Sequence, residues 1–175
     1  MKTKRILLAI TALLFIAGGL LYYGSNFAKT MIHDQLSEQK IKFNSKEELE
    51  KAGESAYIIK FAGQEVDTGT EAKAYSEYIK GHIKKIANGK TYSEVSAEFQ
   101  KDRNNQTLAA QRQNLFMGET LRGLLLSAYG WGVVGNIAYY ASLAMFAAGI
   151  LAIVAIFTLK TDTQSKTTKK KSAKK

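Results

Sequence analysis

Few side chains in this sequence are of the types that carry enzyme chemistry. The chain contains two histidines, His33 and His82, and no cysteine, which excludes disulfides and thiolate chemistry. A non-haem iron site needs two histidines and a carboxylate that converge on one metal ion. Asp34 adjoins His33, but adjacent helical residues point about 100° apart and do not form a ligand pair by themselves. We therefore expect no catalytic residue, no metal ligand and no cofactor.

Three glycines match a dinucleotide-binding pattern in their spacing. Gly130, Gly132 and Gly135 give G-x-G-x-x-G, whose glycines let the backbone of a strand–turn–helix unit approach a pyrophosphate. That chemistry also needs a later acidic residue for the ribose. The next carboxylate is Asp162, beyond a long apolar stretch. Glycines that allow close packing beside a membrane explain the pattern better.

Glu119 and Arg122 form the clearest pair of opposite charges. They are three residues apart, so they can pair on one face of a helix. An exposed pair of this kind contributes only about 0.3 kcal/mol, but near lipid it avoids desolvation of either charge. We interpret the pair as an anchor at the membrane interface, with a clamp for a ligand or a lipid headgroup as the alternative.

The first element that must position these residues is an apolar stretch near the N-terminus. Residues 6–23 are uncharged and long enough to cross a hydrocarbon core of roughly 30 Å at about 1.5 Å per residue. A cleaved signal peptide is the alternative, because residues 2–5 are basic and residues 17–19 are small. The apolar run continues to Tyr23, beyond what a signal peptide needs, and this favours an uncleaved anchor.

A second, longer apolar stretch lies near the C-terminus. Residues 123–159 carry no charge and are too many for one upright span. We place the second transmembrane helix at residues 139–159, so that Tyr139 and Tyr140 share an interface with Tyr22 and Tyr23.

The apolar residues before this second helix need a separate interpretation. We expect residues 121–138 to form an interfacial or re-entrant segment, with Trp131 at headgroup depth. The alternative is a longer, tilted span that begins near Val133.

The distribution of charge predicts the topology. The chain has a net charge of +10. Residues 1–5 hold three basic side chains, and residues 160–175 hold seven lysines against one aspartate, so these tails carry nine of the ten net charges. Basic residues close to a span are retained in the cytoplasm. We expect both termini to be cytoplasmic and residues 24–120 to be extracytoplasmic. The C-terminal lysines are also suited to anionic lipid headgroups, whereas nucleic acid is not expected.

The extracytoplasmic segment reads as a series of helices. The first continues the N-terminal span through residues 25–40, and a last one runs from about Asn105 toward the membrane. Between them, three capping boxes each predict a helix start: Ser45 with Glu48, Thr68 with Glu71, and Thr91 with Glu94. Gly53 and the pair Asn88–Gly89 predict helix ends. Residues 41–43 and 57–61 are candidates for short strands.

The helix that follows Thr68 is amphipathic. An apolar stripe lies opposite Lys73, Lys80 and Lys84 at 100° per residue. We predict that this stripe is an interface with neighbouring helices or with a partner. Its members are Ala72, Tyr75, Ile79, Ile83 and Ile86.

Small residues suggest how the two spans pack, because helices in lipid associate through close backbone approach. Residues 17–19 of the first span include Gly18 and Gly19. Ala144, Ala148 and Ala152 recur every four residues on the second span. We predict an antiparallel hairpin in which Gly18 meets Ala144.

Four short strings resemble an uncharacterised family of small actinobacterial membrane proteins with two spans. They are residues 33–36 (HDQL), 62–64 (AGQ), 90–93 (KTYS) and 118–126 (GETLRGLLL). The resemblance extends over most of residues 5–159 and excludes the lysine-rich tail. Members are often labelled aromatic ring-opening dioxygenases, a label that we interpret as transferred in error. The resemblance implies the architecture and no mechanism.

The sequence thus predicts an all-α membrane protein with two transmembrane helices that flank an extracytoplasmic helical segment. We expect a structural or protein-interaction component of the cell envelope that contacts lipid and either oligomerises or binds an envelope protein. A membrane-anchored, metal-dependent enzyme is one alternative. An oligomeric, holin-like pore is another.

Overall fold

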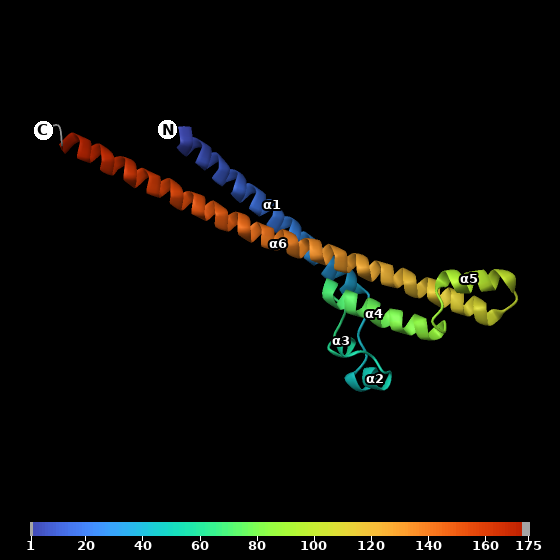
Figure 1. Ribbon diagram of the computed structural model, residues 1–175. Helices are drawn as coiled ribbons and strands as arrows, with labels where there is room; N and C mark the ends of the chain where they lie inside the picture. The colour runs from blue at the N-terminus through green and yellow to red at the C-terminus, as the bar shows by residue number, and fades with distance from the viewer. Residues whose placement is uncertain (1, 173–175) are drawn as a thin grey trace. The chain divides into compact units, whose positions relative to one another are not determined.

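The computed structural model describes residues 2–172, and side chains from residue 4 to residue 158. Over this range the regular structure is helical (Figure 1). The helices are α1 (Lys2–Glu38), α2 (Lys46–Lys51), α3 (Ala56–Ile59), α4 (Gly69–Ile86), α5 (Tyr92–Lys101) and α6 (Gln106–Ser172). The prediction of an all-helical chain is confirmed.

The described chain divides into two compact units. One combines residues of Met1–Phe27 with residues of Gly135–Lys175, and we call it the hairpin. The other is Ala28–Val134, which we call the helical unit. Both α1 and α6 contribute residues to each unit.

Two of the helices are long and apolar enough to cross a membrane. The qualifying stretches are Lys4–Glu38 in α1 and Gln106–Thr158 in α6. Residues 121–138 belong to α6 without interruption. This segment was predicted to be separate, but proline is absent from the chain and the helix has no break at which a re-entrant loop could turn.

Small side chains at seven-residue spacing form the inner faces of the hairpin. On α1 the buried positions include Thr11, Gly18 and Ser25. On α6 they include Gly135, Ser142 and Gly149. A seven-residue repeat keeps one face of a helix against its partner, and small residues on that face allow the backbones to approach.

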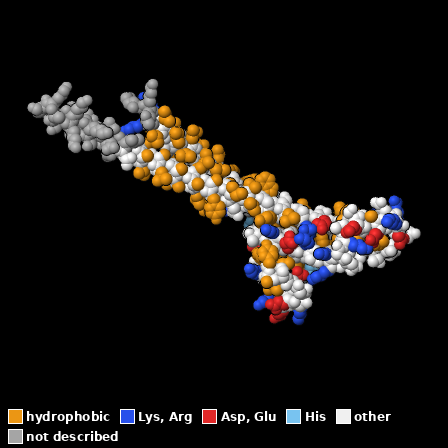
Figure 2. Space-filling view, viewed as in Figure 1, with side chains coloured by type: hydrophobic (Ala, Val, Ile, Leu, Met, Phe, Trp, Pro, Cys, Tyr) orange, Lys and Arg blue, Asp and Glu red, His pale blue; other side chains and the backbone are white. Residues whose placement is uncertain are grey.

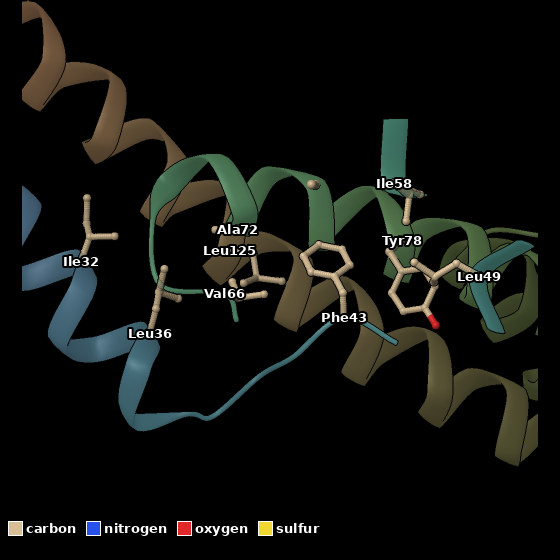
Figure 3. Close-up of a cluster of buried hydrophobic side chains, with 10 residues drawn as sticks. Ile32, Leu36, Phe43, Leu49, Ile58, Val66, Ala72, Tyr78 and Leu125 are labelled. Atoms are coloured by element: carbon tan, nitrogen blue, oxygen red, sulfur yellow. The ribbon is translucent and has the colours of Figure 1, made fainter. Parts of the chain in front are cut away.

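The core of the helical unit gathers around α4 (Figure 3). Phe43 packs edge-on against Tyr75, with ring centroids 5.1 Å apart, and stacks on Phe61 at 5.6 Å. Leu125 of α6 contributes to the same cluster and is 2% exposed. The apolar side of α4 therefore lies among side chains from several elements. The buried members of this core are Ile32, Leu36, Phe43, Leu49, Ile58, Val66, Ala72, Ala74, Tyr78 and Leu125.

Residues 41–43 pair with residues 64–66 in a short extended contact. The Phe43 amide donates to the Gln64 carbonyl at 2.9 Å, and the Val66 amide donates to the Ile41 carbonyl at 2.9 Å. The prediction of a strand at residues 57–61 is wrong. Ser55 caps a helical turn there by accepting from the Ile58 amide, and the bulky residues of the turn pack against the core instead of pairing.

The three predicted capping boxes are present at α2, α4 and α5. At α2, for example, the Ser45 amide donates to Glu48 Oε2 at 2.9 Å, while the Glu48 amide donates to Ser45 Oγ at 3.3 Å. The predicted helix ends are also present, because Gly53, Asn88 and Gly89 all have positive φ. These short signals fix where the helices of the unit begin and end.

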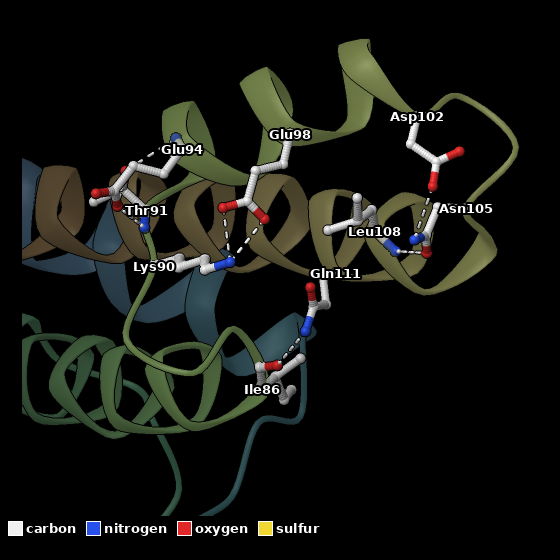
Figure 4. A network of polar contacts seen from close by, with 9 residues as sticks. All are labelled: Ile86, Lys90, Thr91, Glu94, Glu98, Asp102, Asn105, Leu108 and Gln111. Atoms are coloured by element: carbon white, nitrogen blue, oxygen red, sulfur yellow. Dashed lines mark hydrogen bonds and ion pairs between the residues drawn. The ribbon is translucent and has the colours of Figure 1, made fainter.

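A network of polar contacts surrounds α5 and the start of α6 (Figure 4). Lys90 Nζ lies 2.7 Å from Glu98 Oε2, across the turn that precedes α5. The Asn105 side chain accepts from the Leu108 amide at 3.1 Å and so caps the first turn of α6. Gln111 Nε2 donates to the Ile86 carbonyl at 3.2 Å, which joins α6 to the end of α4.

Candidate functional site

The two histidines lie in different local environments within the helical unit. His33 Nδ1 is 3.5 Å from Asp67 Oδ2, and both side chains are exposed. His82 Nδ1 is 3.3 Å from the Tyr78 carbonyl, and its ring meets the Tyr78 ring edge-on at 4.5 Å. Among the described residues, no three side chains of His, Cys, Asp or Glu are grouped to hold a metal ion.

The glycines of the G-x-G-x-x-G pattern lie inside α6 and do not form a strand-to-helix turn. Gly132 instead marks a close approach between α6 and the start of α4. A Cβ on Gly69 would lie 3.2 Å from the Tyr129 Cα and 3.5 Å from the Gly132 Cα. The backbones of α4 and α6 meet here because neither glycine carries a side chain.

The predicted stripe of α4 is buried along most of its length. Ala72 is fully buried, Ile83 is 6% exposed, and Tyr75 and Ile79 are partly buried. Ile86, at the end of the helix, is 45% exposed. The contacts of the stripe lie within this chain, including Ile83 against Gly118 of α6.

Sequence reasoning missed that α4 has a second buried face. Ala74 and Ser76 are fully buried and Tyr78 is 9% exposed. A single hydrophobic stripe finds one partner surface, whereas this helix is covered from more than one side. The small size of Ala74 and Ser76 was the available signal.

Glu119 and Arg122 do pair, and Arg122 also reaches another helix. Arg122 Nη1 lies 2.5 Å from Glu119 Oε2, and Arg122 Nε donates to the Ser76 carbonyl of α4 at 3.2 Å. The Arg122 side chain is only 16% exposed. The arginine therefore joins α6 to α4 while its charge remains paired.

A second polar link between these helices comes from Lys73. Its Nζ lies 3.4 Å from the Tyr129 hydroxyl and 4.7 Å from the centroid of the Tyr129 ring. The lysine thus combines a hydrogen bond with a cation–π contact. Lys73 had been assigned to the solvated face of α4, but it contributes to the packing of α4 on α6.

Inside the hairpin, the predicted contact between Gly18 and Ala144 is wrong. A Cβ on Gly18 would lie 3.0 Å from the Phe146 ring and 3.4 Å from the Met145 Cβ. Ala144 and Ala148 are exposed, whereas Ala152 is partly buried. Gly19 has open space around it. The four-residue alanine pattern marks a different side of α6 from the side that packs on α1.

The true contact alternates small and aromatic residues. A Cβ on Gly149 would lie 2.9 Å from the Phe15 ring, just as Gly18 faces Phe146. The rings of Phe15 and Phe146 are 6.0 Å apart. Each glycine therefore provides room for a phenylalanine of the opposite helix. The seven-residue recurrence of small residues, from Gly18 to Ser25 on α1 and from Ser142 to Gly149 on α6, was the sequence signal for this register.

The outward side of the hairpin is covered by large apolar side chains. Figure 2 shows hydrophobic side chains over its visible face and charged side chains over the helical unit. On α1, Leu13 is 65% exposed and Leu20 is 69% exposed. The exposed members on α6 are Ile137, Tyr140, Leu143, Ile150, Leu151, Ile153, Val154 and Phe157.

Two pairs of tyrosines meet at one level of the hairpin. The rings of Tyr22 and Tyr139 are 6.3 Å apart, and those of Tyr139 and Tyr140 are 5.5 Å apart. Tyr23 and Tyr140 are about 70% exposed, at 71% and 69%. Amphipathic rings gathered at one depth are typical of a membrane–water interface.

The helical unit also contains an open groove of about 490 Å³ between the end of α1 and the middle of α6. Its floor includes Ile32, Leu36 and Leu125, which belong to the buried core. No lysine or arginine lines it. The lining residues are Met31, Ile32, Gln35, Leu36, Glu38, Gln39, Ile41, Leu121, Leu124, Leu125, Ser127, Ala128 and Trp131.

Perturbed pKa values in the helical unit have structural causes. Burial raises the pKa of the Tyr75 hydroxyl. Burial, followed by the nearby Tyr75, Glu54 and Glu48, raises the pKa of Tyr78. The capping hydrogen bonds from Thr91 lower the pKa of Glu94. These groups lie in the core or at a helix start and do not converge on one site.

No protein-family model, curated protein or solved structure matches this chain. The resemblance to an actinobacterial two-span family therefore stays a prediction.

Proposed function

We propose that this chain is an integral membrane protein whose hairpin spans the bilayer and whose helical unit lies outside the cytoplasm. The observation that carries the proposal is the apolar outer surface of the hairpin. Large contiguous apolar patches are rare on soluble monomers, because each Å² of apolar surface left in water costs about 25 cal/mol. Lipid removes that cost for residues such as Leu13, Leu20 and Leu151.

The dimensions of the hairpin fit a bilayer. From Arg5 to Tyr22 is seventeen residues of continuous helix, or about 26 Å at ~1.5 Å per residue. A hydrocarbon core is roughly 30 Å thick. The tyrosine level then marks the outer interface, and Lys4 and Arg5 mark the inner one.

The packing of the hairpin supports an uncleaved N-terminal helix. Phe15 occupies the space beside Gly149, and Gly18 accommodates Phe146. Removal of α1 as a signal peptide would expose the matched face of α6, including Ser142. A helix whose partner is fixed within the same chain has a structural reason to keep it.

The orientation follows from the basic tails. The side chains of the C-terminal lysines lie outside the described side chains, but their charge is a property of the sequence. Retention of both tails in the cytoplasm would place the helical unit on the opposite side. There its mixed charges face water, and the tail remains available to anionic headgroups.

The molecular role that fits this architecture is a structural or protein-interaction component of the cell envelope. The helical unit is held to its own α6 by Arg122, Lys73 and Gln111. Such a unit is a rigid body presented at the membrane surface. The proposal assigns it contacts with an envelope protein or with a second copy of the chain.

The absence of cysteine allows a direct test of topology. Thr70 is exposed on α4, and Thr163 lies in the basic tail. We expect Thr70→Cys to react with a membrane-impermeant maleimide in intact cells, and Thr163→Cys to react only after permeabilisation. Both variants should remain in the membrane pellet after alkaline carbonate extraction. Labelling of Thr163→Cys alone in intact cells, or release of the protein by carbonate, would contradict the proposal.

A further inference from the structure

The groove between α1 and α6 is the strongest feature that packing does not explain. Its volume of about 490 Å³ falls within the roughly 300–1,000 Å³ of typical small-molecule sites, which are mostly apolar with a few polar groups. Trp131 and Leu124 line it and remain 54% and 65% exposed. Large side chains with this exposure favour an apolar occupant.

The size of the groove distinguishes between apolar occupants. An α-helix is about 10 Å or more across, so one turn of 5.4 Å already fills roughly 420 Å³. The groove would therefore hold about one turn of a partner helix. A single flexible hydrocarbon chain fits such a space without the long contact that a docked helix needs.

The two ends of the groove differ in polarity. Met31, Ala128 and Trp131 line one end. Further along α1, the lining includes Gln35, Glu38 and Gln39. The occupant that matches this gradient is an amphiphile, with its chain over the apolar floor and its polar group beside the amides and the carboxylate.

The charge of the lining selects the headgroup. Glu38 is exposed, and among the described side chains it forms no ion pair. Since no lysine or arginine lines the groove, an anionic headgroup would meet a carboxylate with no compensating charge. A headgroup that ends in an ammonium group complements Glu38.

A path for the chain lies along α1 itself. At 100° per residue, Leu20, Phe27 and Met31 fall within about 40° of one another on this helix. Leu20 is 69% and Phe27 is 60% exposed. An apolar face thus runs along α1 from the proposed span to the lining of the groove.

We propose that this groove binds one acyl chain of a zwitterionic membrane lipid, with the ammonium group of phosphatidylethanolamine beside Glu38. The inference rests on the proposed function, because the lipid enters from a bilayer that the hairpin spans. It makes the protein a reader of lipid composition at the outer membrane surface.

Trp131 provides the reporter, since it is the only tryptophan in the chain. The full-length protein is reconstituted in vesicles of phosphatidylethanolamine and phosphatidylglycerol in equal amounts. Brominated acyl chains, which quench tryptophan on contact, are placed on one lipid or on the other. Bilayer composition is then constant. We expect quenching to show a preference of roughly two- to fivefold for brominated phosphatidylethanolamine, the range of one exposed ion pair.

Two variants separate the chain from the headgroup. Ala128→Phe fills the groove and should remove the preference, whereas Ala110→Phe, exposed on α6 outside the groove, should keep it. Glu38→Gln should equalise the two lipids without disturbing the fold, whereas Glu47→Gln on exposed α2 should not. If Ala128→Phe fails to fold, Glu38→Gln alone decides.

Three outcomes would overturn the inference. Equal quenching by both brominated lipids in the unsubstituted protein would mean ordinary contact with bulk lipid. No quenching by either lipid, in protein that floats with the vesicles, would mean that protein covers the groove. Loss of preference in Glu47→Gln would remove the role of Glu38. Protein that does not float with vesicles at all contradicts the proposed function itself and not the groove alone.

Discussion

Close contacts at glycine determine how α4 lies on α6. The Cβ of an alanine at Gly118 would overlap the Ile83 side chain. Gly123, five residues later on the same helix, has open space around it. The two positions carry the same residue in the same helix and differ only in what a methyl group would meet.

We predict opposite effects of alanine at these two glycines. Gly118→Ala should lower the free energy of unfolding by about 1–3 kcal/mol, because overpacking forces Ile83 to move. Gly123→Ala should raise it by about 0.5–1 kcal/mol, because alanine favours the helix. Thermal unfolding in detergent, followed by circular dichroism, measures both.

A double-mutant cycle tests the physical reason. Ile83→Ala removes the atoms that Gly118→Ala would contact, so the two changes together should cost less than their sum. Strict additivity would show that the Gly118 contact with Ile83 is not what limits the packing of α4.

The buried tyrosines make the helical unit sensitive to alkali. Burial raises the pKa of Tyr75 and of Tyr78 above the usual value of about 10. Above that pH the unfolded chain loses these protons first, so the native state is destabilised as pH rises; below it, both states are protonated and the stability is intact. We predict that Tyr75→Phe reduces the loss of stability between about pH 8 and about pH 11. Urea unfolding at both pH values measures it, and an unchanged difference would contradict the prediction.

At the scale of elements, local signals predicted the helix boundaries of the helical unit well. Ser45, Thr68 and Thr91 each satisfy free amides at a helix start, and this chemistry depends on residues within one turn. The strand predicted at residues 57–61 failed because the same bulky residues suit a strand or a capped helical turn. Only the partner of residues 41–43 decides between them, and that partner, residues 64–66, lies at a distance in sequence.

The cap of α4 gives a prediction at this scale. Thr68→Ala removes the acceptor for the Thr70 amide and one half of the capping box, and should cost about 1 kcal/mol. Thr70→Ala, exposed in the first turn, should change stability by less than about 0.5 kcal/mol. Equal effects of the two substitutions on thermal unfolding would show that the cap does not stabilise α4.

The inward face of α4 is tested by charge. Ile83→Asp puts an unpaired carboxylate at a position that is 6% exposed, and should cost several kcal/mol. Lys84→Asp, on the adjacent exposed position, should be mild. The measurement is resistance of the helical unit to limited proteolysis in membranes. Similar resistance of both variants would contradict the burial of this face.

At the scale of the whole molecule, the sequence predicted two long apolar helices but not the register between them. Length and absence of charge are properties of each helix alone, whereas register depends on which faces meet. Ala144 and Ala148 resembled a packing motif, yet Gly18 faces Met145 and Phe146. The groove in the helical unit was missed for the same reason, since its lining comes from residues about ninety positions apart in the chain, such as Ile32 and Leu125.

The register gives the last prediction, and the cysteine-free chain makes it testable. A Cβ on Gly18 lies 3.4 Å from the Met145 Cβ, close to the roughly 3.5–4.5 Å that a disulfide requires. Gly18→Cys with Met145→Cys should form a disulfide within one chain on oxidation in detergent, seen as faster migration without reductant. Gly19→Cys with Ala144→Cys is the control, because Gly19 faces open space and Ala144 is exposed. Crosslinks of the control pair within one chain would place Ala144 at the contact after all. Disulfides of the first pair that form only between chains would mean that the two helices pack between molecules, because the same matched faces of glycine and phenylalanine can meet in either way.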